Sequence, residues 1–265
     1  MIVRNIPLSL FGAAFMIGVA VAADTNPNLF TNSPAEKIVL IGPNRPDDLQ
    51  QYAASELVRH IEKITEVKPR LLKVADIRAA KLPTDSNVIM LGRTVDNPLL
   101  KGLSEGGFFQ PNTEEQGYSL RIDVNPNDPQ GRRWLAVLAG ADPRGVLWAV
   151  RDFCHFHFYR DAGGVTLRPD RVSMAPPLKV RMLSESCCNL FSAKNDHQGF
   201  MHTPHLNRFS HDVVFDKQYF VDWLSEWKVT HVNFVWGNFA AYREPAKEFV
   251  AYAHARGVRV FVHYV

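Results

Sequence analysis

Cysteine is scarce in this sequence, and so is net charge. Only three of the 265 residues are Cys (Cys154, Cys187 and Cys188), too few for a scaffold held by several disulfides or for a four-cysteine zinc site. Lys and Arg number 30 and Asp and Glu 27, which leaves a net charge of +3. So small an excess does not predict nucleic acid or an anionic membrane as the main partner.

Common nucleotide-binding and nucleophile motifs are missing as well. The chain contains no P-loop, no GxGxxG and no GxSxG, so NTPase, dinucleotide-binding and serine hydrolase functions have no support in the sequence. We therefore expect no cofactor. Internal repeats are absent too, whereas 46% of the residues are hydrophobic and 22% are charged, which is typical of a globular protein of one or two domains.

Long apolar runs are limited to the first residues. Arg4 precedes an almost wholly apolar stretch, residues 6–23, which ends in Ala-Val-Ala-Ala before Asp24. A basic start, an apolar middle and small residues at the exit predict a signal peptide over residues 1–23, and hence a secreted or periplasmic protein. The alternative is a retained membrane anchor, because about 18 apolar residues are just enough to span a bilayer.

Residues 24–36 are polar and contain proline, which indicates a leader loop. The region 37–176 then predicts an α+β domain, a mixed sheet with packed helices, because β-branched runs indicate strands and apolar residues every three or four positions indicate helices. A helix start is clearest at Asp142 and Pro143, an N-cap followed by a first-turn proline. The expected strands cover 37–41, 70–74, 88–91, 117–123 and 134–140, the expected helices 49–64 and 143–153, and residues 161–177 are expected to form loops and short extended pieces.

Pro176 and Pro177 mark a domain boundary, because paired prolines interrupt both helices and strands. Beyond them strands alternate with helices, which favours parallel pairing. The expected order is a strand (178–183), a helix after Asp216 with Phe220, Trp223, Leu224 and Trp227 inward, a strand (232–236), a helix from Pro245, and a strand (258–265).

The length of this second region suggests part of a larger architecture. A (β/α)8 TIM barrel uses roughly 31 residues per unit, so residues 177–265 match its first three βα units. Three parallel strands cannot close a barrel, and the outer strands would keep unpaired N–H and C=O groups. We therefore expect an apparently truncated barrel and a chain that is the N-terminal part of a longer protein. The alternative is a small three-stranded α/β domain.

The most distinctive segment is residues 138–153, Leu-Ala-Gly-Ala-Asp-Pro-Arg-Gly-Val-Leu-Trp-Ala-Val-Arg-Asp-Phe, followed by the helix at 52–65. With shorter matches at 38–40, 88–92 and 117–120, these segments resemble the N-terminal domain that precedes the catalytic barrel in exported bacterial glycoside hydrolases. Family-20 β-hexosaminidases and family-67 α-glucuronidases are examples. The resemblance covers most of residues 37–176, and it implies a domain that packs on the barrel and does not itself cut sugar.

The resemblance implies that the complete protein hydrolyses glycosidic bonds of a polysaccharide or glycan. Family-20 enzymes carry an Asp-Glu pair after the fourth barrel strand, and α-glucuronidases place their carboxylates later still. The catalytic acid and base are therefore expected beyond residue 265. Hydrolysis generally needs two such groups about 5–9.5 Å apart, so residues 1–265 alone are expected to be inactive.

Candidate substrate-binding residues follow from the position of active sites at the carboxyl ends of barrel strands. Glu185 and Asn189 follow the first strand, Trp236 ends the second, and His263 lies in the third. Arg181, in the first strand, is loosely similar to an Arg that binds sugar hydroxyls in family-20 hydrolases. The alternatives are an internally paired or solvent-facing Arg181, a core Trp236 and a buried His263.

The segment 195–211 contains one Asp and four His residues, yet no metal-ligand spacing such as HExxH. We expect a polar loop lining the cleft and no metal site. A carbohydrate is thus the expected partner. The rival function is that of a non-catalytic carbohydrate-binding or cell-surface protein with the same architecture. The polar loop is predicted from Asp196, His197, His202, His205 and His211. The predicted sugar-binding residues are Arg181, Glu185, Asn189, Trp236 and His263.

Overall fold

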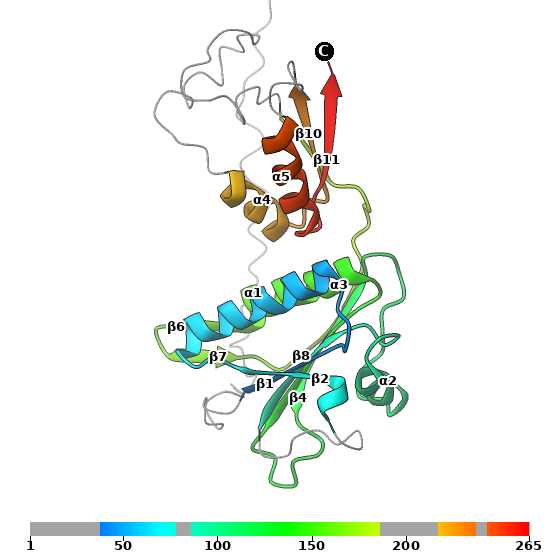
Figure 1. The fold of residues 1–265 in the computed structure, drawn as a ribbon. Coiled ribbons are helices and arrows are strands. Elements are labelled where there is room, and N and C mark those ends of the chain that lie inside the picture. Colours follow the sequence, from blue (N-terminus) through cyan, green and yellow to red (C-terminus); the bar gives the residue numbers. More distant parts are fainter. Residues whose placement is uncertain (1–37, 78–85, 186–216, 237–242, 265) are drawn as a thin grey trace, which may run out of the picture.

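The computed structural model of the chain describes residues 38–77, 86–185, 217–236 and 243–264. They form a six-stranded mixed sheet with helices, followed by a three-stranded parallel sheet with two helices (Figure 1). The expected boundary at Pro176 and Pro177 lies between the two sheets. In the part of the chain that is described, no helix is both long and apolar enough to cross a membrane.

The first sheet has the strand order β2-β1-β3-β5-β4-β8. Strands β2, β1, β3 and β5 are parallel, whereas β4 runs antiparallel to both β5 and β8. A separate hairpin pairs β6 with β7. The bounds are β1 Ile38–Gly42, β2 Arg70–Lys73, β3 Asn87–Gly92, β4 Tyr118–Val124, β5 Trp134–Gly140, β6 Phe158–Asp161, β7 Gly164–Leu167 and β8 Asp170–Met174.

Helices cover both faces of this sheet. On one face α1 (Asp48–Thr65) and α3 (Pro143–Asp152) lie side by side, and α2 (Pro98–Glu105) lies on the other (Figure 1). The strands in the middle are therefore buried on both sides, which explains their continuous apolar sequence. In β5, all seven residues are buried.

Capping residues mark the starts of α1 and α3. Asp47 caps α1 by accepting from the backbone N–H of Gln50 (2.8 Å), and the Gln50 side chain accepts in return from the N–H of Asp47. Asp142 caps α3, its Oδ1 accepting from the N–H of Gly145 at 2.8 Å, with Pro143 in the first turn. The predicted start of this helix is confirmed.

Asp142 also accepts from the N–H of Gln116 at 2.6 Å through its second oxygen, so one carboxylate joins the start of α3 to the turn before β4. We predict that Asp142→Ala lowers the free energy of unfolding by about 2 kcal/mol, the upper end for loss of an N-cap. Urea denaturation measures the change. Asp142→Asn keeps a capping oxygen and is expected to lose less. Equal stability of the Ala variant and the original protein would contradict the prediction.

The sequence prediction missed helix α2 and the β6–β7 hairpin, and it did not place β8 in the main sheet. Residues 161–177 were expected to be loops and short extended pieces, but β8 is an edge strand of the main sheet and pairs with β4 over Tyr118–Ile122. Most of β8 is exposed, with only Val172 half-buried, so its apolar signal is weak. Helix α2 was also missed, although Asn97 caps it and Pro98 follows.

The second sheet is parallel and has the order β11-β10-β9. Its strands are β9 Met182–Glu185, β10 His231–Trp236 and β11 Arg259–Tyr264. Helices α4 (Lys217–Glu226) and α5 (Arg243–His254) cover one face with a small apolar cluster. The other face leaves Met182 and Phe261 about half exposed, at 54% and 52%. The observed fold is mixed α/β, and the closed barrel remains a prediction.

Helix α4 corrects one expectation about packing. Trp223 and Trp227 were predicted to face inward, but they are 39% and 69% exposed. The contacts of α4 with α5 use Asp222, which accepts from the Tyr252 hydroxyl, and the apolar contacts use the buried Leu224. The tryptophans stand beside this contact face, where their spacing of four residues makes them neighbours, with ring centroids 6.5 Å apart.

Candidate functional site

The carboxyl edge of the β9–β11 sheet holds most of the predicted substrate-binding residues. Backbone register pairs Glu185 with Phe234, while His263 pairs with Val235 in the next row. Trp236 ends β10 in the row after that. Glu185, Trp236 and His263 therefore lie within three consecutive rows at one edge of the sheet, and their role in binding substrate stays a prediction. Asn189 and the His-containing loop 195–211 lie outside the described residues.

Arg181 is not part of this edge. It was predicted to lie within the first strand, but β9 begins at Met182 and Arg181 precedes it, at the amino end. Its guanidinium donates to the carbonyl of Lys228 (2.7 Å), to the Gln116 side chain (3.1 Å) and to the carbonyl of Leu178. All three guanidinium nitrogens thus have acceptors within the protein, which favours the internally paired alternative.

These contacts of Arg181 join the two sheets. Gln116 precedes β4 in the first unit, and its amide donates to the carbonyl of Lys179 at 2.7 Å. The Arg181 guanidinium also lies over the ring of Trp148 in α3, 5.4 Å from its centroid. Burial, and then the charge of nearby Arg144, lower the pKa of Arg181. We infer that Arg181 anchors the start of β9 to the first domain.

A second contact joins the end of α3 to the turn before β10. Lys228 Nζ lies 2.6 Å from Asp152 Oδ1, and the Tyr118 hydroxyl donates to the other oxygen of the same carboxylate. Lys228 also lies over the Tyr118 ring, 5.1 Å from the centroid. Burial and the hydrogen bond to Asp152 raise the pKa of Tyr118, so the phenol stays protonated and continues to donate.

A third contact stacks one cation between two aromatic rings. The Arg256 guanidinium lies 4.8 Å from the ring centroid of Tyr52 in α1 and 3.2 Å from that of Tyr252 in α5. Asp222 in α4 accepts from Arg256 and from the Tyr252 hydroxyl. Burial raises the pKa of Tyr252 to about 12 and raises that of Tyr52 as well. Both phenols are therefore neutral at physiological pH, and the guanidinium is attracted to the faces of their rings.

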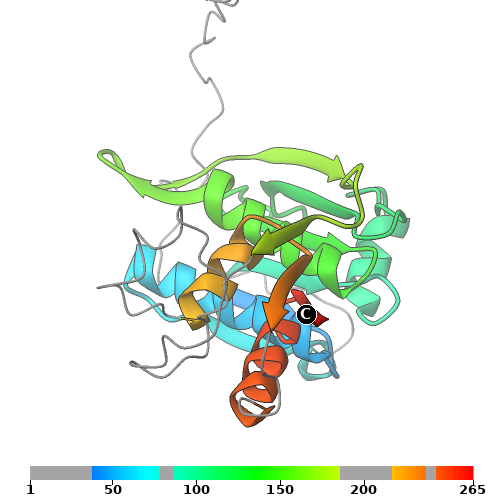
Figure 2. The same cartoon turned by 90° about the horizontal axis from the view of Figure 1, so that it is seen from above.

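All of these contacts are made by the amino end of the second sheet. Arg181 and Thr230 precede β9 and β10, and Gly257, whose carbonyl accepts from Arg144 at 2.9 Å, precedes β11. The second unit therefore stands on α1 and α3 (Figure 2), and the arrowheads of β10 and β11 point away from them (Figure 1). Its carboxyl edge remains on the side that the first domain does not cover.

Sequence reasoning did not find these interface residues. Tyr52 lies in the helix expected at 49–64, whose apolar residues recur every three or four positions, and its hydroxyl in fact accepts from Arg151 at 2.8 Å. Interface arginines such as Arg144 and Arg256 occupy helix or turn positions that look like ordinary solvent-facing sites. The available signal was weak, because only the packing of two distant segments gives these side chains their partners.

Cys154 behaves as a buried apolar residue. It is 8% exposed and free, and burial raises the pKa of its thiol. A thiol held protonated is a poor nucleophile. Over the described ranges, no group of three or more His, Cys, Asp or Glu side chains is arranged to hold a metal ion. Cys187 and Cys188 lie outside those ranges.

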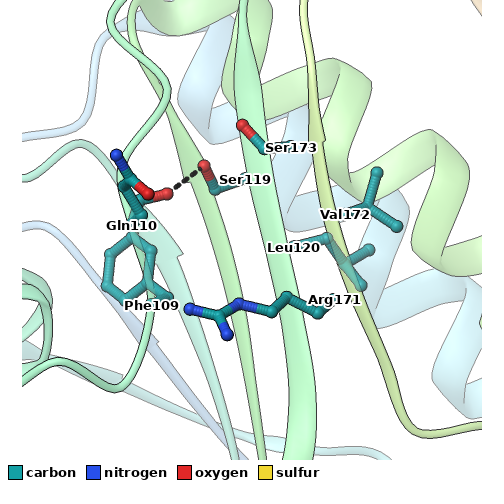
Figure 3. Close-up of a pocket in the computed structure, with 7 residues that line it drawn as sticks. All are labelled: Phe109, Gln110, Ser119, Leu120, Arg171, Val172 and Ser173. Atoms are coloured by element: carbon teal, nitrogen blue, oxygen red, sulfur yellow. Dashed lines mark hydrogen bonds between the residues drawn. The ribbon is translucent and has the colours of Figure 1, made fainter.

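A pocket of about 240 Å³ lies in the first domain, away from the carboxyl edge of β9–β11. It is formed by β4, β8 and the segment before β4 (Figure 3). Ser119, at its base, donates to the carbonyl of Gln110 at 2.7 Å. The Arg171 side chain reaches across β4 toward Phe109 in the same view. Sequence reasoning missed this pocket because β8 was not recognised as a strand.

Known proteins resemble this chain in structure, but no family model or curated protein matches its sequence. A GH138 enzyme targeting pectin rhamnogalacturonan II superposes with a TM-score of 0.50 at 12% identity, over 86% of this chain and 31% of that one. A GH115 4-O-methyl-α-glucuronidase with specificity for decorated arabinogalactans superposes with a TM-score of 0.52 at 10% identity, over 85% and 28%.

Both of these solved structures are glycoside hydrolases, and the fold of this chain is similar to theirs. The chain spans less than a third of the length of either. The shared region covers at least 85% of this chain, and therefore extends past the first sheet into the second. The likeness thus concerns the combination of the two units as well as the first one.

Proposed function

We propose that this chain is the N-terminal portion of an exported glycoside hydrolase that cleaves glycosidic bonds of a polysaccharide or glycan. The observation that carries the proposal is the likeness to two glycoside hydrolases across both sheets. In this proposal residues 1–23 are the signal peptide, residues 37–176 the accessory domain, and residues 177–265 the first three βα units of a (β/α)8 barrel. The mature protein is secreted or periplasmic.

The contacts at the amino end of the second sheet support this division of labour. In (β/α)8 enzymes chemistry takes place at the carboxyl ends of the strands, while the opposite end serves stability. Here the accessory domain supports the amino ends through Arg181, Lys228 and Arg256. Substrate then has access to the edge that carries Glu185, Trp236 and His263. The catalytic acid and base belong to later strands.

The specific activity is proposed as α-glucuronidase-like or β-N-acetylhexosaminidase-like. The first is favoured, since one of the two similar structures is a glucuronidase. The test is expression of the complete open reading frame and assay on glucuronoxylan oligosaccharides and on nitrophenyl N-acetylhexosaminides. We expect release of glucuronic acid units by the complete protein and none by residues 1–265. Absence of cleavage of any glycoside would favour the rival, a non-catalytic carbohydrate-binding protein.

Export has its own measurement. N-terminal sequencing of protein recovered from the periplasm or the medium is expected to begin after residue 23, near Asp24, because the small residues before it suit signal-peptide cleavage. Mature protein that still begins at Met1 would contradict a cleaved signal and leave the membrane anchor as the explanation.

A further inference from the structure

One face of the first sheet is left without a helix at the β4–β8 end. On this face α2 and Phe109 pack over β1, β3 and β5 as one apolar cluster. Toward β8 the side chains become polar, with Ser119 opposite Ser173 and Arg121 opposite Arg171 in the register of the two strands. The pocket of about 240 Å³ lies there. The proposed function gives this pocket no role.

The two arginines face each other directly across the strands. Like charges opposite one another destabilise a sheet, so the pair carries a cost unless an anion offsets it. Arg121 has a partner, Asp123, and lies over the Phe108 ring, 5.6 Å from the centroid. Even so, no hydrogen-bond acceptor among the described residues reaches its buried Nε.

Arg171 is the less satisfied of the two. Within the described ranges, no carboxylate lies within ion-pair distance of its guanidinium, and only its backbone N–H has a side-chain acceptor, Asp170. Figure 3 shows the guanidinium over the pocket between β4 and Phe109. A free guanidinium beside a second one is an arrangement suited to bidentate binding of a carboxylate.

The rest of the lining suits a small, mixed polar and apolar ligand. Phe109 gives the pocket an apolar wall, while the Ser173 hydroxyl accepts from the Asn112 side chain at 3.2 Å. The side chain of Leu120 packs into the core on the other face of the sheet. A volume of about 240 Å³ is below the roughly 300–1,000 Å³ of pockets for drug-sized ligands. The space therefore fits one sugar ring with its carboxylate, and the neighbouring units of a polysaccharide would lie outside it.

We propose that this pocket binds the carboxylate of a uronic acid unit, with Arg171 as the principal ligand-binding residue and Ser173 contacting a sugar hydroxyl. The sugar part of this inference rests on the proposed function, whereas the carboxylate part rests on the arginines. The site lies in the accessory domain, away from the carboxyl edge of β9–β11. It would hold an acidic polysaccharide on the enzyme without taking part in bond cleavage.

Binding of single sugars to the 265-residue chain tests the proposal. D-glucuronate and D-galacturonate are titrated and followed by NMR line broadening of the sugar, with D-glucose, D-galactose and acetate as comparison ligands. We expect the uronates to bind more tightly than the neutral sugars and than acetate. Arg171→Ala is expected to weaken uronate binding about tenfold or more, because a charge-assisted bidentate contact is lost. Arg171→Lys keeps the charge without the fork and should fall between.

Arg70→Ala is the matched control. Arg70 is likewise an exposed arginine on an edge strand, β2, at the opposite end of the same sheet. This variant is expected to bind uronates as the original protein does. Equal binding of uronates and neutral sugars, equal binding of acetate, or unchanged binding by Arg171→Ala would each overturn the proposal. Failure of the glycosidase assay would leave it standing, because uronate binding is measured without catalysis.

Discussion

Gly145→Ala is expected to remove most of the stability of this protein. A Cβ at this position would lie 2.1 Å from the carbonyl oxygen of Gly117 and 3.2 Å from the Cα of Gly140. The obstacles are backbone atoms, which cannot rotate away as a side chain can. We therefore expect a loss of about 4 kcal/mol or more, beyond the roughly 1–3 kcal/mol that is usual for overpacking. Urea unfolding and soluble yield measure it.

The crowding has a structural reason. The turn from β5 into α3 passes against the start of β4, where the N–H of Ala141 donates to the carbonyl of Gly117 at 2.9 Å. Gly140 is similarly confined, since its Cβ would lie 2.2 Å from the N of Val146. These glycines are needed because three stretches of backbone meet at van der Waals distance.

Gly102→Ala provides the control for this prediction. Gly102 lies inside α2, and a Cβ there would meet no atom within 4 Å. Alanine is favoured over glycine in a helix interior by roughly 0.5–1 kcal/mol, so this variant is expected to gain stability. If Gly145→Ala unfolds at the same urea concentration as the original protein, the close approach at the strand-to-helix turn is wrong.

Arg151→Met is expected to cost about 3 kcal/mol. Arg151 is buried in α3, with a side chain only 6% exposed, and its Nη1 lies 3.0 Å from Glu56 Oε2 in α1. Removing one partner of a buried ion pair leaves an uncompensated charge, which costs about 3–5 kcal/mol. The Met side chain keeps the aliphatic volume, so the loss reports the charge together with its hydrogen bond to the Tyr52 hydroxyl. Glu56 retains an exposed partner, Arg59, which places the expected value at the lower end.

Arg59→Met removes the exposed partner of the same carboxylate and serves as the control. The Arg59 side chain is 71% exposed, and exposed ion pairs contribute about 0–1 kcal/mol. A double variant, Arg151→Met with Glu56→Leu, is expected to recover part of the loss, because no buried charge remains unpaired. Equal costs for Arg151→Met and Arg59→Met in urea unfolding would contradict the assignment of the buried pair.

Arg151→Met also tests how the two units are joined. Arg151 lies 3.7 Å from Glu226 at the end of α4, in addition to its contacts within the first domain. Its loss is therefore expected to weaken the seat of the second sheet on α1 and α3. Limited proteolysis between the units, near Pro176 and Pro177, should become faster in Arg151→Met than in Arg59→Met.

Elements with strong local signals were predicted well. The start of α3 followed from Asp142 and Pro143, and β5 followed from its unbroken apolar run, because caps and periodicity act over a few residues. Strand β8 carries no such signal. It forms because its backbone pairs with β4, about 50 residues earlier in the chain, where Val172 lies opposite Leu120.

The candidate sites divide in the same way. The row positions of Glu185, Trp236 and His263 at one edge followed from strand order, although their role in binding is still a prediction. The location of Arg181 did not follow from strand order. Arg181 lies one residue before the start of β9, and its guanidinium there contacts the first domain. The pocket beside Arg171 depended on recognising β8.

What the sequence by itself determined is the set of helices and strands with clear caps or periodic apolar residues, and the parallel arrangement of the second unit. The tertiary structure alone decided which polar side chains meet. In sequence, Arg151 and Arg256 look like ordinary surface residues and Tyr52 looks like an apolar helix residue. They become an interface because α1, α3 and α5 come together. Local propensities act within a few residues, whereas charge pairing and ring stacking depend on distances that only the folded chain establishes.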